Sequence, residues 1–337
     1  MIQNGKFDEL DVINSLLSST TKYSVAVKQL EKRFGGRNVL IEFAEQEVKE
    51  ILKETEKKAK EVLKGYPIWE KWLKNVPGVG IKLAVPLIKY IRPIERFPNP
   101  SKLIVYAGFA IKPYCAICGK DFEYNQKDEL IRHLQMEHGI KENFMDFFVG
   151  RADINRKSKL KPVLFNIADS MIKRPDTFYR EQYNAFKNEI RAKYIKMVDP
   201  ADAVGQPAAD NIGKKSPGQI LEETDVAGMN VVPVFKPVLR PVTATVGMLL
   251  CEDVGKVKAG TVISMNAVNA IKKEGKTHVL VVPTKKGIDM QARRKLIKLF
   301  LSHLWEVWRK LEGLPVVLPY PVKMGMHEYI PPPYWED

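Results

Sequence analysis

Four side chains near the middle of the chain have the types and the spacing of a metal site. Cys115 and Cys118 are separated by two residues, and His133 and His138 follow them. Cysteine thiolates and histidine imidazoles are ligands that Zn²⁺ prefers, and four of them complete a tetrahedron with no position left for water. The pattern therefore predicts a closed Cys2His2 site in which Zn²⁺ is structural rather than catalytic.

The residues around these ligands predict a single zinc finger inserted at residues 114–139. Phe122 and Leu130 stand where such a finger places its two core side chains, and the spacing predicts a helix from about Lys127 to Glu137. A finger of this kind reads DNA bases, contacts another protein or holds a loop in place. The sequence leaves these three roles open.

The segment Pro77-Gly78-Val79-Gly80 is a second candidate, because it lies between two helical patterns. Glycine permits the positive φ angles of a tight turn. The helix that follows opens with backbone N–H groups that a phosphate can approach, since no bulky side chain stands in the way. Helix, Pro-Gly-x-Gly and helix form a helix-hairpin-helix pattern, which binds nucleic-acid backbones without reading the base sequence. A plain turn between two packed helices is the alternative.

Basic residues are in excess over the whole chain. The formal net charge is +14, from 54 Lys and Arg against 40 Asp and Glu. This excess favours an anionic partner, and because the basic residues gather in a few segments we expect DNA or structured RNA rather than a membrane surface. The predicted nucleic-acid contacts are Gly78, Gly80, Lys82, Arg151, Arg156, Arg293 and Arg294.

The chain does not have the features of a membrane protein or of an exported one. No apolar run approaches the roughly 18 residues of a membrane span, and Met1-Ile-Gln-Asn-Gly-Lys6 does not have a signal-peptide pattern. Three cysteines, two of them in the metal-like pair, argue against a disulfide framework and favour a reducing compartment. We therefore expect an intracellular, cytoplasmic and nucleoid-associated protein with no membrane partner.

Periodicity and composition predict the elements that must position these residues. Residues 1–66 predict a short helical lead-in and a long helix from Val39 to Leu63, whose apolar spacing fits either a coiled coil or one arm of a bundle. Residues 198–285 are rich in Val, Pro and Gly, which predicts a β-rich insertion. The expected fold class is mainly α, with a helix-hairpin-helix core, an inserted zinc finger and a small inserted α+β domain. The helical core comprises residues 67–113, 140–197 and 286–337.

Three blocks of the helical core carry a further pattern. The first runs from Val76-Pro-Gly-Val-Gly80 through Ile94-Glu-Arg-Phe-Pro-Asn-Pro-Ser-Lys-Leu103 to Tyr106-Ala-Gly-Phe109. The second is Lys161–Ile172 with Tyr179, Tyr183 and Lys187, and the third is Met290–Arg309 with His327 and Ile330-Pro-Pro-Pro333. In this order they resemble the C-terminal transposase domain of the insertion-sequence family whose recombinases are guided by a bridge RNA.

The resemblance implies a protein of DNA transposition and recombination that binds DNA and a guide RNA and forms a homodimer through the long helix. That family cuts DNA with a serine of this domain and with acidic metal ligands on a separate RNase-H-like domain. Ser158, within Asn155-Arg-Lys-Ser158-Lys, is the candidate catalytic nucleophile, although the finger is inserted where the family's serine would stand. The residues ahead of Val39 are too few for the acidic domain, so we expect it to be missing or supplied by a partner nuclease.

Three functions of different classes remain open. The first is a nucleic-acid-binding, transposase-like protein without catalysis of its own. The second is an active serine-dependent recombinase whose metal-binding domain belongs to another polypeptide. The third is an adaptor that contacts other proteins through the finger and the β-rich insertion. The sequence favours the first and leaves enzymatic activity, the DNA target and the use of a guide RNA open.

Overall fold

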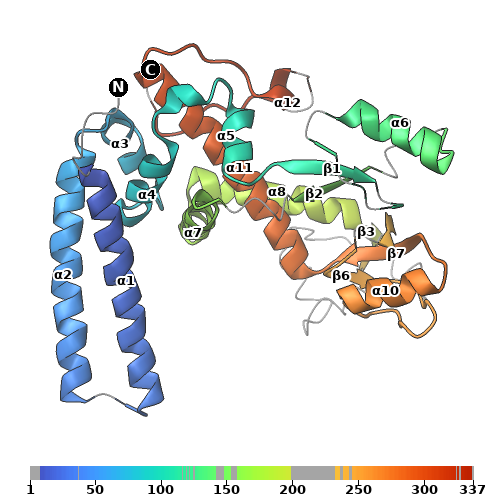
Figure 1. Cartoon of the computed structure of the whole chain (residues 1–337), viewed down its shortest axis with the longest axis horizontal. Coiled ribbons are helices and arrows are strands. Elements are labelled where there is room, and N and C mark those ends of the chain that lie inside the picture. The colour runs from blue at the N-terminus through green and yellow to red at the C-terminus, as the bar shows by residue number, and fades with distance from the viewer. Residues whose placement is uncertain are drawn as a thin grey trace. The chain divides into compact units, whose positions relative to one another are not determined.

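The computed structural model shows a mainly helical protein (Figure 1). It describes residues 8–36, 38–115, 117–118, 120, 122–123, 126–141, 148–152, 158–198, 232–235, 238–242, 245–323, 325 and 328–335. The chain divides into two compact units, the first formed by Met1–Gly108, Lys157–Arg180 and Ile297–Asp337 and the second by Phe109–Arg156 and Glu181–Leu296. These boundaries differ from those of the four regions expected from the sequence, which stay a prediction. None of the described helices is both long enough and apolar enough to cross a membrane.

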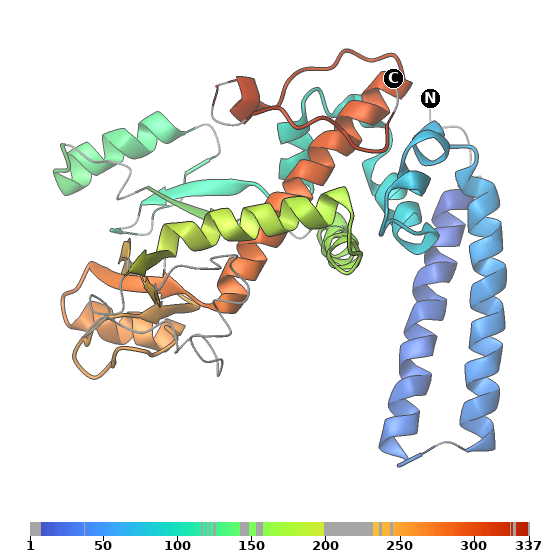
Figure 2. The same cartoon turned by 180° about the vertical axis from the view of Figure 1, so that it is seen from behind.

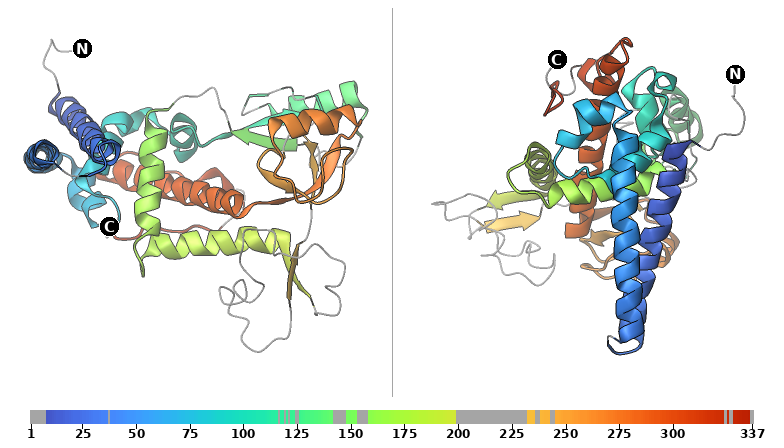
Figure 3. Two further views of the ribbon diagram at one scale, coloured as in Figure 1. Left: turned by 90° about the horizontal axis from the view of Figure 1, so that it is seen from below. Right: turned by 90° about the vertical axis from the view of Figure 1, so that its left-hand side faces the viewer.

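The first unit begins with two long helices, α1 (Glu9–Arg33) and α2 (Val39–Leu63). They run side by side as a helical hairpin, which Figure 2 and Figure 3 show from other directions. Asp8 and Asn38 each cap one helix by accepting a hydrogen bond from a backbone N–H of its first turn, at 3.0 and 2.9 Å. The bounds of α2 confirm the predicted long helix, whereas α1 is longer than the short lead-in that the sequence predicted.

Shorter helices complete the first unit. They are α3 (Pro67–Lys71), the 3-10 helix η1 (Leu73–Asn75), α4 (Ile81–Ile91), the 3-10 helix η2 (Ile94–Arg96), α5 (Pro100–Tyr106), α7 (Leu160–Ile172) and α12 (Tyr320–Lys323). Two longer helices, α8 (Phe178–Tyr194) and α11 (Lys285–Leu311), contribute residues to both units.

Large aromatic side chains form much of the core of the first unit. Trp72 stacks on Phe300 with ring centroids 5.9 Å apart, and both side chains are fully buried. The indole N–H of Trp305 donates to the carbonyl oxygen of Phe97 at 2.7 Å, which satisfies the one polar atom of that buried side chain. These contacts hold α11 against segments that lie far earlier in the chain.

The second unit carries the strands, and its described residues form small antiparallel sheets. The strands are β1 (Ile111–Cys115), β2 (Phe148–Ala152), β3 (Ile195–Val198), β4 (Val232–Phe235), β5 (Val238–Pro241), β6 (Met248–Leu250) and β7 (His278–Pro283). β1 pairs with β2, β3 pairs with β4, and the third sheet has the strand order β5-β7-β6.

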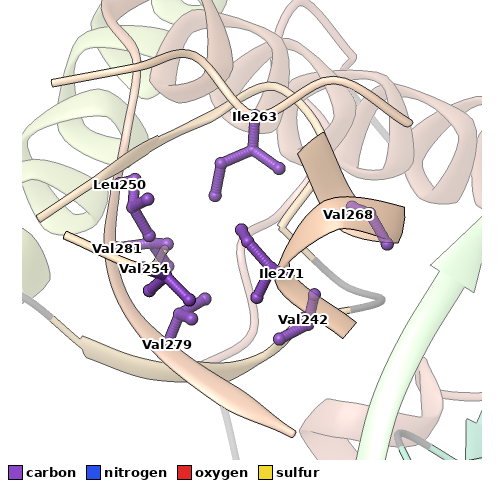
Figure 4. Close-up of a cluster of buried hydrophobic side chains, with 8 residues drawn as sticks. All are labelled: Val242, Leu250, Val254, Ile263, Val268, Ile271, Val279 and Val281. Carbon is purple, nitrogen blue, oxygen red and sulfur yellow. The ribbon is translucent and has the colours of Figure 1, made fainter. Parts of the chain in front are cut away.

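A helix covers the third sheet and closes an apolar core (Figure 4). This helix, α10 (Met265–Lys273), is capped by Ser264, whose hydroxyl accepts a hydrogen bond from the N–H of Ala267 at 3.2 Å. The core consists of Val242, Leu250, Val254, Ile263, Val268, Ile271, Val279 and Val281. These contacts explain the valine-rich composition of the predicted insertion, of which residues 199–231 lie outside the described part.

Candidate functional site

The four predicted metal ligands lie together in the second unit. One ligand atom from each of Cys115, Cys118, His133 and His138 lies within 4.8 Å of the others. The Sγ of Cys118 is 3.2 Å from the Nε2 of His133, and the two imidazole rings meet edge to face with centroids 4.9 Å apart. The structure thus confirms a cluster of two cysteines and two histidines that could hold a metal ion.

Local folding brings the two halves of this cluster together. Cys115 ends β1, and its N–H donates to the carbonyl oxygen of Lys120 at 2.9 Å, which turns the chain back on itself. The histidines lie on α6 (Lys127–His138), whose observed bounds match the predicted helix to within one residue. Gly139 ends α6 with a φ of 65°, the left-handed conformation that glycine adopts most readily.

A small apolar core supports the cluster. It consists of Cys115, Phe122, Leu130 and Leu134, with Ile117 and Ile140 packed against it. Phe122 and Leu130 are the two residues predicted from the finger pattern, and they are buried as expected. The ligands therefore sit on a core that is too small to be stable by itself, which is the situation in which a bound metal contributes to folding.

The burial and the protonation of the two histidines favour the binding of a metal cation. The Nε2 of His138 is buried and neither donates nor accepts a hydrogen bond within the described part of the chain. Burial lowers the pKa of His133, and the nearby His138 lowers it further, so the neutral imidazole that can bind a metal is favoured. An unsatisfied buried nitrogen is costly, and a metal ion would satisfy it. The donor set and its geometry thus fit a metal ion.

The glycine turn of the predicted helix-hairpin-helix pattern, Pro77-Gly78-Val79-Gly80, lies in the first unit, between η1 and α4. Gly80 is the N-cap of α4 and provides no side chain to cap the helix. Its carbonyl oxygen accepts hydrogen bonds from the N–H groups of Leu83 and Ala84, each at 2.9 Å, so the first orphan N–H groups belong to Ile81 and Lys82. A Cβ placed on Gly80 would meet nothing within 4 Å, so the approach to these groups is open.

An open hollow of about 660 Å³ surrounds this helix start. Three cationic side chains line this hollow, Lys74, Lys82 and Arg174, and we therefore call it the basic hollow. Lys82 Nζ lies 2.8 Å from a carboxylate oxygen of Glu56, and Lys74 Nζ lies 2.8 Å from one of Glu70. Within the described residues, the Arg174 guanidinium forms no ion pair. The sequence predicted Lys82 but missed Lys74, although it directly precedes Asn75 and the turn, and Arg174, which comes from the end of α7.

Gly78 has a packing role that the sequence did not predict. Its φ is 96°, and a Cβ at this position would lie 2.9 Å from the backbone nitrogen of Met171 and 3.0 Å from its Cα. Helix α7 therefore approaches the turn too closely for any side chain. This contact alone accounts for glycine at position 78, so the phosphate contact of Gly78 stays a prediction from the sequence.

The other predicted nucleic-acid contacts, Arg151, Arg156, Arg293 and Arg294, lie in the second unit. Arg293 Nε is 2.7 Å from Oδ2 of Asp289, and the hydroxyl of Tyr183 donates a hydrogen bond to the other carboxylate oxygen, Oδ1. Burial raises the pKa of Asp289, but the Tyr183 and Arg293 contacts outweigh it, and the pKa lies below its usual value. Arg294 is exposed and forms no ion pair with another described residue. The side chain of Arg151 and all of Arg156 lie outside the described part.

Ser158, the candidate nucleophile, lies just before α7. Its Oγ accepts a hydrogen bond from the N–H of Leu160 at 3.3 Å, and its carbonyl oxygen accepts one from the N–H of Lys161 at 3.2 Å. These are the bonds of a residue that starts a helix. No described acid or base side chain is hydrogen-bonded to the Ser158 hydroxyl, so its catalytic role stays a prediction. His327 lies outside the described residues.

Comparison with protein-family models, with curated proteins and with solved structures finds no match for this chain. The fold and the two sites define a mainly helical protein with a candidate Cys2His2 metal centre and a basic hollow at a helix start. The likeness to the transposase domain stays a prediction from the sequence.

Proposed function

We propose that this chain binds nucleic acid through the sugar-phosphate backbone, at the basic hollow. The observation that carries the proposal is the convergence of Lys74, Lys82 and Arg174 on an open helix start. Orphan N–H groups and the helix dipole favour an anion at such a position, and the three cations add charge around it. Contacts of this kind position a protein on DNA or RNA without reading the base sequence.

The whole-chain properties support the same function. A net charge of +14 attracts a polyanion, and Arg294 offers a further exposed cation. The resemblance of the three blocks favours a role in DNA transposition or recombination, with guide RNA as a second ligand. Because a helix start already explains the contacts of Ser158, we propose that catalysis comes from a partner nuclease rather than from this chain.

Lys82→Ala is expected to weaken binding about fivefold, because one phosphate contact is lost. Binding of duplex DNA, branched DNA and structured RNA across a salt series measures this loss. Lys58→Ala is the matched control: it removes the same charge from α2, where Lys58 pairs with the exposed Glu61 at 3.2 Å. Equal affinities of the two variants, or no binding of any of the three nucleic acids, would contradict the proposal.

For the metal centre, we propose that Cys115, Cys118, His133 and His138 bind Zn²⁺ and that they form a zinc finger. Two thiolates and two imidazoles are a typical structural zinc set, and all four coordination positions are filled by protein. In this role the ion stabilises the segment around α6 and leaves no site for a reacting water.

The helical hairpin supports a proposal for homodimer formation. The sequence placed the homodimer contact on the long helix α2, and we propose instead that it lies on α1. Exposed apolar side chains form a stripe along α1 and at its C-cap, at intervals of four and seven residues: Val12, Leu16, Tyr23, Leu30 and Phe34. Tyr23 is 66% exposed and Phe34 is 67% exposed. Heptad spacing on an exposed face is typical of a coiled coil, so we propose that the stripes of two copies pair.

Replacing two residues of the stripe, as in the double variant Tyr23→Glu, Leu30→Glu, is expected to convert the dimer to a monomer, because two charges on each chain would be buried against an apolar face. Analytical ultracentrifugation at several concentrations measures the mass. Val25→Glu is the control, since Val25 is also exposed on α1 but lies off the stripe. A wild-type protein that sediments as a monomer would exclude this interface.

A further inference from the structure

Glu56 occupies an unusual place at the basic hollow. Among the described residues that line the hollow, Glu56 is the only acid. Its carboxylate oxygen lies 2.8 Å from Lys82 Nζ, the cation closest in sequence to the open start of α4. The two side chains come from different helices, α2 and α4, so their contact is a product of the tertiary fold.

We propose that Glu56 is an intramolecular competitor of the nucleic-acid phosphate for Lys82. This inference rests on the proposed function of the basic hollow. A carboxylate and a phosphodiester both present anionic oxygens to the same ammonium group, and a lysine ammonium accepts either partner because its contact has no fixed planar geometry. The phosphate therefore reaches Lys82 only when Glu56 gives up its contact.

The contact is suited to exchange rather than to permanent structure. Both side chains are partly exposed, 47% for Lys82 and 36% for Glu56, and an exposed ion pair of this kind contributes little to stability. The backbone of α2 need not move, because the neighbouring Thr55 and Ala59 are buried and hold the helix in place. Rotation of the Glu56 side chain into solvent is enough to free the ammonium group.

Competition has a consequence for affinity and for its salt dependence. In the wild type, a phosphate that binds Lys82 replaces an anion of the protein itself, so little net charge is neutralised at this position. Without the carboxylate, the same contact neutralises one more phosphate charge. Glu56→Gln is therefore expected to bind duplex DNA about three- to fivefold more tightly, with a salt dependence of log K that is steeper by about one.

The experiment compares Glu56→Gln with Glu61→Gln in the full-length chain, using the same DNA duplex across a salt series. Glu61 is also on α2 and pairs with Lys58, away from the hollow, so the two variants change the net charge equally. A double-mutant cycle with Lys82→Ala tests whether Glu56→Gln changes the affinity through Lys82. We expect Glu56→Gln to have no effect in the Lys82→Ala background, because the competitor acts only through that lysine.

The outcomes separate this inference from the proposed function. Wild-type binding that Lys82→Ala weakens, together with equal affinities of Glu56→Gln and Glu61→Gln, would overturn the competition and leave the binding site standing. A gain in affinity that persists in the Lys82→Ala background would also overturn it, since the effect would then be one of general charge. Absence of DNA binding by the wild type and by Glu56→Gln would overturn both.

Discussion

Cys118→Ser is expected to abolish stoichiometric zinc binding and to unfold the segment from Tyr114 to Lys141. The four ligand atoms lie within 4.8 Å of one another, and the core beneath them consists of only a few apolar side chains. Zinc binding supplies about 10–16 kcal/mol of apparent free energy in zinc-finger peptides, far more than such a core provides. Loss of one ligand therefore removes most of the stability of the segment.

Two measurements check this expectation. Metal analysis of purified protein should give one Zn²⁺ per chain for the wild type and almost none for Cys118→Ser, and amide hydrogen exchange should become fast over residues 127–138. Cys251→Ser is the matched control, because Cys251 is a free cysteine that does not belong to the metal cluster. Stoichiometric zinc in Cys118→Ser, or its loss in Cys251→Ser, would refute the assignment.

Acidification from pH 7 to pH 5 is expected to destabilise the first unit by about 2 kcal/mol through His303 alone. His303 is buried in α11, where its Nδ1 lies 3.0 Å from the Tyr179 hydroxyl and its Nε2 lies 2.9 Å from the carbonyl oxygen of Ile330. Nε2–H must donate to that carbonyl, so Nδ1 accepts from the Tyr179 hydroxyl. Both bonds use the neutral ring.

The direction of the pH effect follows from the pKa of His303. Burial lowers this pKa from 6.5 to about 4, although the bond to Ile330 raises it slightly. The unfolded chain therefore binds a proton at higher pH than the folded chain does. The stabilisation is fully present above pH 6.5 and is lost progressively as the pH falls. At pH 4 the loss amounts to about 3 kcal/mol.

Urea unfolding at pH 7, 6 and 5, followed by tryptophan fluorescence, tests this expectation. All five tryptophans of the chain lie in the first unit, so the signal reports on that unit. His303→Gln keeps a donor and an acceptor but does not titrate, so its loss of stability between pH 7 and 5 should be about 2 kcal/mol smaller than that of the wild type. Both proteins keep Cys115, Cys118, His133 and His138, so any contribution of that cluster to the pH dependence is common to the two. Parallel pH dependences in the two proteins would contradict the role of His303.

Much of the metal cluster and of the helix pattern was predictable because the determinants are local. The two cysteines and two histidines lie within 24 residues, so a turn and one helix suffice to bring them together. The long helix from Val39 to Leu63 was predictable because its apolar residues recur at helical spacing and polar residues fill the other positions. The structure confirms both ends of this helix. Periodicity of this kind depends on backbone geometry and not on distant contacts.

The sequence by itself thus determined a mainly helical, basic protein with a Cys2His2 cluster and a glycine turn before a helix. Only the tertiary structure decided what surrounds that turn. Glu56 reaches the hollow from α2 and Arg174 from the end of α7, while the backbone of Met171 excludes a side chain at Gly78. Spacing along the chain cannot give these contacts, because they depend on how separate helices pack, and packing is settled by the shapes of many side chains together.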